Sequence, residues 1–217
     1  MQSKKPVIIF GSGTTKDAVE KLMEISSKFL IPVISTPRAK GKGVSKIADT
    51  YLGNMGISDT PLVNELLDEN EFDIVLTIGA GFSSYSTNSW DPVITSRNMM
   101  VQVNIDPSAL GRIFKADIGV ISDAEIFSAQ LLNFMNKSTE ENQVELRSKW
   151  LSKYILNEKW AFPKRKTDNS NKNPSPVEII RSVDEGIGEN GIIVSDANSI
   201  LLWATHFLPE RPNRRFI

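Results

Sequence analysis

Short apolar runs, most of which end at a glycine or an aspartate, constrain the fold of this chain more than any other feature. They lie at residues 6–10, 31–35, 72–78, 99–105 and 117–121, and helix-length segments separate most of them. Continuous apolar strands are buried on both faces, which is typical of a parallel sheet covered by helices. The pattern predicts an α/β domain over residues 1–136, a doubly wound parallel sheet of Rossmann-like type with flanking helices. Helices are expected after Thr14 or Thr15, at 61–67 and at 124–135, and the glycine-containing stretch 36–55 is expected to form loops.

The pattern changes between residues 137 and 173, which we interpret as a linker. A charged, tryptophan-bearing helix is expected at about 140–160, followed by a polar, turn-rich segment. The alternation restarts in residues 174–217, with a helix at 176–187, a strand at 191–195 and a helix at 199–208. One strand between two helices cannot bury both faces of a sheet, so we expect a partial second α/β domain. The chain is therefore expected to be a fragment of a longer protein.

The charge balance and residue usage exclude several classes of function. The chain has 25 basic and 26 acidic residues and a formal net charge of -1, so no global field favours nucleic acid or an anionic membrane. No apolar run approaches the roughly 18 residues of a membrane span. The absence of cysteine excludes disulfides and thiolate metal sites and fits a reducing compartment. With no signal-peptide core at the N-terminus, the expected location is the cytoplasm.

Candidate ligand-binding residues follow the predicted strands, because open parallel sheets bind ligands at the carboxyl ends of their strands. Glycine lets the backbone approach a ligand, and aspartate can accept hydrogen bonds from it. The alternative is that the glycines only turn the chain and the aspartates cap helices, and the sequence leaves both interpretations open. The candidates for a nucleotide site are Gly11, Ser12, Gly13, Gly79, Gly81, Asp106 and Asp123.

Other familiar sites are disfavoured by the residues present. Lys16 stands where a dinucleotide fingerprint has its third glycine, and Ser35 and Thr36 stand where an acid would bind the ribose, so standard NAD recognition is not expected. His206 is the only histidine, and without partners it is expected to pack or to lie on the surface. The moderately basic segment 149–166 is expected to be a linker rather than a nucleic-acid surface.

A set of ordered phrases carries a resemblance to a known family. They are "PVIIFGSGTTKDAVEKLMEIS", "IPVISTPRAKG", "YLGNMG", "FDIVLTIGAGF", "VQVNIDPSALGR" and "VISDA", followed by "PSPVEIIRSV" and "GIIVSDANSILLWATHFLPERPNRRFI". The first six resemble the central domain, of the DHS-like NAD/FAD-binding type, of thiamine diphosphate-dependent enzymes of the acetolactate synthase and pyruvate oxidase type. The last two resemble the start of the diphosphate-binding domain of the same enzymes.

The resemblance implies a three-domain parent enzyme that acts on a 2-keto acid with thiamine diphosphate and Mg²⁺ as a carboligase or decarboxylase. In such enzymes the activating glutamate precedes the region matched here, and the Gly-Asp-Gly to Asn metal motif follows it. No catalytic residue and no metal ligand is therefore expected in this chain, which should be inactive alone. The implied partners are the remaining domains of the parent, assembled as a homodimer or homotetramer.

The resemblance also implies a cofactor loop at Asp196, Ala197, Asn198 and Ser199, which would contact the diphosphate. Because a carboxylate repels phosphate, we expect Asp196 to cap the following helix while Asn198 and Ser199 make the contact.

Flavin-containing members carry an arginine where this chain has Gly81, and acidic residues where it has Ser83 and Ser84. This departure argues against FAD and leaves a non-flavin carboligase or decarboxylase open. Two alternatives remain: a non-catalytic module that binds FAD, ADP or coenzyme A, and a purely structural scaffold between catalytic domains.

Overall fold

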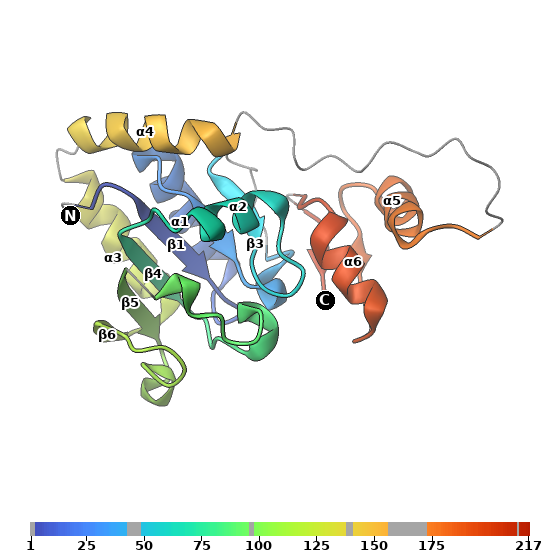
Figure 1. Cartoon of the computed structure of the whole chain (residues 1–217), viewed down its shortest axis with the longest axis horizontal. Coiled ribbons are helices and arrows are strands. Elements are labelled where there is room, and N and C mark those ends of the chain that lie inside the picture. The colour runs from blue at the N-terminus through green and yellow to red at the C-terminus, as the bar shows by residue number, and fades with distance from the viewer. Residues whose placement is uncertain (1–2, 43–48, 96–97, 138–140, 156–172, 212) are drawn as a thin grey trace.

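A computed structural model describes residues 3–42, 49–95, 98–137, 141–155, 173–211 and 213–217. It forms a large lobe built on a parallel sheet and a small C-terminal lobe beside it (Figure 1). The strands of the large lobe are β1 (Pro6–Phe10), β2 (Val33–Ser35), β3 (Tyr51–Asn54), β4 (Ile74–Ile78), β5 (Met99–Asn104) and β6 (Ile118–Ile121). They pair in the order β3-β2-β1-β4-β5-β6, and every pairing is parallel. This order confirms the predicted doubly wound α/β fold.

Helices cover both faces of the sheet because successive side chains of a strand point to opposite faces. The helices of this lobe are α1 (Lys16–Phe29), α2 (Pro61–Glu69), α3 (Ala124–Asn136) and α4 (Glu141–Ile155). Ile8 and Phe10 pack with α1 and α3 in one core, and Val7 and Ile9 pack with α2 and α4 in the other. Short 3-10 helices lie at Pro37–Ala39, Ser84–Thr87, Pro92–Ile94 and Pro107–Ala109.

Strand β3 lies in the stretch that we expected to form loops. Its residues are buried and pair with β2, with a register shift between Val33 and Ile34. Gly53 and Asn54 give it no apolar alternation, and Gly53 has a positive φ of 114°. A strand that contains glycine and a buried polar residue escapes a search for apolar runs.

Helix α4 lies within the range 137–173 that we expected as a linker, yet it belongs to the second core. Trp150, Leu151 and Tyr154 are buried there, and the guanidinium of buried Arg147 donates to the carbonyls of Phe29 at 3.2 Å and Ser3 at 2.9 Å. The helix runs along the outside of the large lobe (Figure 1). The rest of the expected linker, 156–172, lies outside the described residues.

The small lobe contains α5 (Pro176–Ile187), β7 (Ile192–Ile193), α6 (Ser199–Phe207) and β8 (Arg215–Phe216), with β7 and β8 paired in parallel. Its core is small and centres on Ile180, Ile193, Ala204 and Leu208. Ile192 and Val194 remain 57% and 75% exposed. The described residues thus leave the apolar β7 segment partly uncovered.

No helix in the described ranges has both the length and the apolar character that crossing a bilayer requires.

Candidate cofactor cleft at the junction of the two lobes

A cleft of about 1000 Å³ lies where the carboxyl ends of β1 and β2 face the small lobe. The large lobe contributes Ser12, Thr14, Thr15, Lys16, Pro37, Arg38, Lys40, Gly41, Lys42 and Tyr85; the small lobe contributes Ser195, Ala197, Leu201, Thr205, Asn213, Arg214, Arg215, Phe216 and Ile217. Both lobes therefore form its walls, so the cleft depends on how they are docked.

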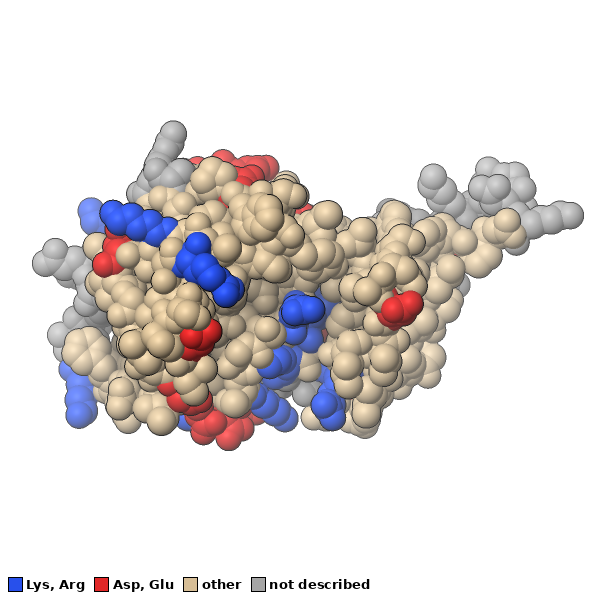
Figure 2. Space-filling view, turned by 90° about the horizontal axis from the view of Figure 1, so that it is seen from below, with Lys and Arg blue, Asp and Glu red and all other residues tan. Residues whose placement is uncertain are grey.

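The cleft is cationic although the chain as a whole is nearly neutral. Six lysine and arginine side chains line it, and no Asp or Glu side chain is found among its described lining residues. Two of the six, Lys40 and Arg214, are paired with Glu210 and Asp184. Basic side chains gather at the junction of the lobes in the space-filling view (Figure 2). Burial lowers the pKa of Lys42, which donates to the carbonyl oxygens of Ser12 and, at 2.8 Å, Thr14. The chemistry of this lining suits an anion.

The glycine turns that follow β1 and β4 are hydrogen-bonded to each other at the switch point, where the strand order of the sheet reverses. The amides of Gly11 and Gly13 donate to the carbonyls of Ile78 and Gly79, both at 2.9 Å. A Cβ on Gly11 would lie 2.3 Å from the Gly79 oxygen, and one on Gly79 would lie 2.7 Å from the Gly13 carbonyl carbon. Close packing therefore accounts for these three glycines, while Ser12 faces the cleft.

Gly81 lies in open space at the end of β4. The nearest atom to a Cβ placed there is Nη2 of Arg112, at 4.0 Å. Gly81 stands where flavin-containing members carry an arginine, and Arg112, from the loop before β6, places a cation near that position. Sequence reasoning did not identify Arg112.

Asp106 and Asp123 both cap helices. Asp106 accepts from the Ser108 amide at 2.9 Å, and the hydrogen bonds from Ser108 lower its pKa. Asp123 accepts from the amides of Glu125 at 2.8 Å and Ile126 at 3.2 Å at the start of α3. This geometry is the capping alternative that the sequence left open.

The expected cofactor loop, Asp196 to Ser199, lies at the start of α6 beside the cleft and is exposed. Asn198 is the residue that caps α6, accepting from the Ile200 amide at 2.9 Å, whereas Asp196 accepts from the adjacent Ala197 amide at 2.7 Å. The expectation that Asp196 caps the helix was therefore wrong. Asn198 is the N-cap of α6, and its side-chain oxygen accepts from a first-turn amide that would otherwise be unpaired.

His206 is half-buried, with its ring 4.5 Å from that of Phe207. Burial raises the pKa of Asp59, and the nearby His206 partly offsets this effect. No group of three or more potential metal-ligating side chains occurs within the described part of the chain.

Sequence reasoning did not identify five of the six cations of the cleft, which are Arg38, Lys40, Lys42, Arg214 and Arg215. Their signal was two basic segments, "PRAKGK" and "RPNRR", that lie about 170 residues apart. Only the docking of the lobes shows that they face one cavity.

Residues 1–131 match the family model described as "Thiamine pyrophosphate enzyme, central domain". The chain belongs to the thiamine pyrophosphate enzymes. The six-stranded sheet and both glycine turns of this family's central domain lie in the matched residues.

Curated relatives extend the similarity beyond the central domain. The chain is 26% identical to the acetolactate synthase large subunit of Cyanidium caldarium, covering 96% of the chain and 34% of that protein. It is 28% identical to the acetolactate synthase large subunit of Lactococcus lactis, covering 99% and 36%. It is 25% identical to the probable acetolactate synthase large subunit of Methanocaldococcus jannaschii, covering 100% and 36%. The chain thus spans about a third of the length of these relatives.

Proposed function

We propose that this chain is the central region of an acetolactate synthase-like enzyme that uses thiamine diphosphate to join or decarboxylate 2-keto acids. The observation that carries this proposal is the continuous similarity to acetolactate synthase large subunits over 96% to 100% of the chain. That similarity includes the small lobe, which lies beyond the central-domain match.

The start of α6 fits a diphosphate better than it fits other groups of the cofactor. The amides of Ala197, Asn198, Ile200 and Leu201 are bonded within the loop and helix. The positive end of the helix dipole still favours phosphate oxygens, and the exposed Ser199 hydroxyl is a donor. The lysine and arginine side chains of the cleft line the same cavity as Ala197 and add positive charge to that of the helix dipole. When bound, thiamine diphosphate supplies an electron sink next to the substrate carbonyl, and Mg²⁺ anchors its diphosphate.

The role of this chain's own residues is to position that cofactor. The exposed loop 196–199 orients the phosphate end, and the large lobe forms the opposite wall of the cleft. The remaining domains of the parent, in a homodimer or homotetramer, would supply the activating carboxylate and the metal ligands, so this chain alone is expected to be inactive.

A second candidate function is a nucleotide-binding module for FAD, ADP or coenzyme A. The specific observation in its favour is the cationic lining of the cleft together with Arg112 beside Gly81. The caps formed by Asp106 and Asp123 and the mutual packing of Gly11 and Gly79 count against it, and FAD is the least favoured of the three ligands.

Two substitutions in the complete enzyme test the diphosphate loop. Asn198→Asp preserves the helix cap, because aspartate and asparagine cap equally well, but it places a negative charge against the phosphate. Ser199→Ala removes one donor. We expect both to weaken thiamine diphosphate binding, with each lost hydrogen bond worth about 0.5 to 3 kcal/mol. Isothermal titration with thiamine diphosphate and Mg²⁺ measures the effect.

Ser182→Ala, an exposed position on α5, is the matched control and should leave the affinity unchanged. Unchanged affinity in both loop variants, with a normal melting temperature, would show that the loop does not hold the diphosphate. Tight binding of ADP to the wild-type chain, lost in Arg38→Ala, would instead favour the nucleotide module.

A further inference from the structure

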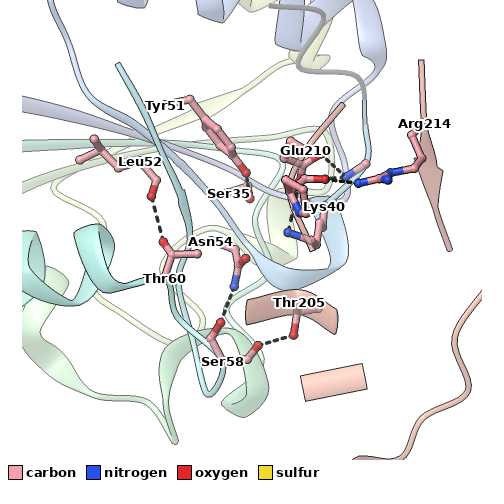
Figure 3. A network of polar contacts seen from close by, with 12 residues as sticks. Ser35, Lys40, Tyr51, Leu52, Asn54, Ser58, Thr60, Thr205, Glu210 and Arg214 are labelled. Atoms are coloured by element: carbon pink, nitrogen blue, oxygen red, sulfur yellow. Dashed lines mark hydrogen bonds and ion pairs between the residues drawn. The ribbon is translucent and has the colours of Figure 1, made fainter. Parts of the chain in front are cut away.

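The two lobes meet through a buried charged contact. Lys40, in the loop after β2, and Glu210, in the turn after α6, are only 3% and 6% exposed. Their side chains form an ion pair at 3.8 Å, and the Glu210 carboxylate also accepts from the Gly41 amide at 3.0 and 3.2 Å. Figure 3 shows Lys40 and Glu210 side by side, with Arg214 next to them. Residues about 170 positions apart in sequence are thus joined at one buried point.

The backbone beside this contact approaches the small lobe closely at Gly41. Gly41 has a positive φ of 76°, and a Cβ on it would lie 2.4 Å from the Phe216 amide nitrogen of β8. Glycine is therefore required both for the conformation and for the close approach of the lobes. A second polar contact lies between the hydroxyls of Ser58 and Thr205, at 2.5 Å.

The small lobe secures its own side of the contact. Arg214 donates to Asp184 of α5 at 2.6 Å and to the Pro209 carbonyl at 2.6 Å, which fixes the turn that carries Glu210. Arg211 binds the same carboxylate at 2.8 and 3.1 Å. The turn is therefore held within its own lobe, and Glu210 is the carboxylate that reaches across.

We infer that Glu210 is a positioning residue that docks the small lobe on the loop after β2 and thereby sets the walls of the cleft. A buried ion pair adds little to stability compared with an apolar pair, but removing one partner leaves an uncompensated buried charge. The contact therefore favours one docking geometry over others. Glu210 reaches the large lobe through Lys40 and the Gly41 amide, so its loss should disturb the docking of the lobes more than the folding of either. The inference holds whether or not the loop 196–199 binds a diphosphate.

Distance measurements between spin labels test this directly, because the chain contains no cysteine. Glu24→Cys on α1 and Ser182→Cys on α5 are both exposed and place one label on each lobe. We expect a single narrow distance distribution in the labelled 217-residue chain. Adding Glu210→Gln should replace it with a broad one, while the far-UV circular dichroism spectrum stays unchanged. Glu189→Gln, an exposed carboxylate of the same lobe, should keep the narrow distribution.

Gly41→Ala provides a second test from the other side of the contact and should broaden the distribution as well. Its control is Gly186→Ala, where no atom lies within 4 Å of the added Cβ. If Glu210→Gln fails to fold, the Gly41→Ala result decides. A narrow, unshifted distribution in Glu210→Gln, or in Gly41→Ala where that variant decides, would overturn the inference.

Discussion

At the scale of single residues, glycine at the switch point is explained by packing rather than by a ligand. Gly79 has a φ of 59°, and a Cβ there would meet the Gly13 carbonyl carbon at 2.7 Å and the Thr14 amide at 2.9 Å. The two turns can approach this closely only because the residues in contact, Gly11, Gly13 and Gly79, are glycines. This contact joins β1 to β4, the pair at which the order of the sheet reverses.

Gly79→Ala should therefore destabilise the large lobe by about 3 kcal/mol, because it combines left-handed strain with overpacking. Gly81→Ala, two residues away in open space, should change the free energy of unfolding by less than about 0.5 kcal/mol. Urea denaturation followed by circular dichroism measures both values. Equal effects of the two substitutions would contradict the packing explanation.

At the scale of elements, α4 is an integral part of the large lobe. The sequence showed its charged residues and its aromatic residues but not which side the latter faced. Trp150 is 5% exposed, and its ring lies 6.1 Å from that of Tyr154 in an edge-to-face arrangement. The Tyr154 hydroxyl in turn donates to Glu69 of α2 at 2.5 Å. The helix thus closes the second core from outside.

Trp150→Ala should cost about 3 to 5 kcal/mol of stability, as expected for removing a buried aromatic side chain from a core. Phe134→Ala on α3 is the matched control, since Phe134 is 65% exposed and should lose little. Thermal melts of the two variants give the comparison. A Trp150→Ala variant as stable as Phe134→Ala would mean that α4 is only loosely attached.

The contact of Asp184 on α5 with Arg211 and Arg214 leads us to expect that the small lobe responds to acid. Burial alone would raise the pKa of Asp184, but the hydrogen bonds from Arg211 and Arg214 outweigh it and hold the pKa below its ordinary value. A carboxylate with a depressed pKa stabilises the fold above its unfolded pKa of about 3.9, and this contribution disappears as the pH falls through the folded value.

We therefore expect the small lobe to lose stability below about pH 4. Asp184→Asn should lower the free energy of unfolding by about 3 kcal/mol at pH 7, because it leaves the two arginines without their carboxylate. The pH dependence between 3 and 5 should be weaker in the variant. Melting curves of the unchanged chain and of the variant across this range provide the measurement. An identical acid response in the variant would assign the effect to other carboxylates.

The sequence predicted those elements whose apolar pattern is continuous. Strands β1, β2, β4, β5 and β6 follow from mostly apolar runs, and α1 follows from helical spacing after a capping Thr14 or Thr15. Helix α3 was expected after the strand end at Asp123. It missed β3, whose glycine and buried asparagine mask it, and β8, which is only two residues long. The cationic cleft could not be predicted, because it forms from side chains that long-range docking brings together.

At the scale of the whole molecule, a complete doubly wound sheet is docked to a small, partly uncovered lobe. The large lobe has its own two apolar cores, whereas the β7 segment of the small lobe leaves isoleucine and valine exposed. The cleft between them carries six cations in a chain of net charge -1. This arrangement suits the proposed role of the chain as a scaffold beside a diphosphate site.

The most direct test of the central claim is the rate of pyruvate consumption by the complete natural gene product, measured beside the 217-residue chain. Our account predicts turnover by the complete product that requires both thiamine diphosphate and Mg²⁺, and none by the chain alone. Turnover independent of thiamine diphosphate, activity of the chain alone, or a natural product that ends near Ile217 would contradict it.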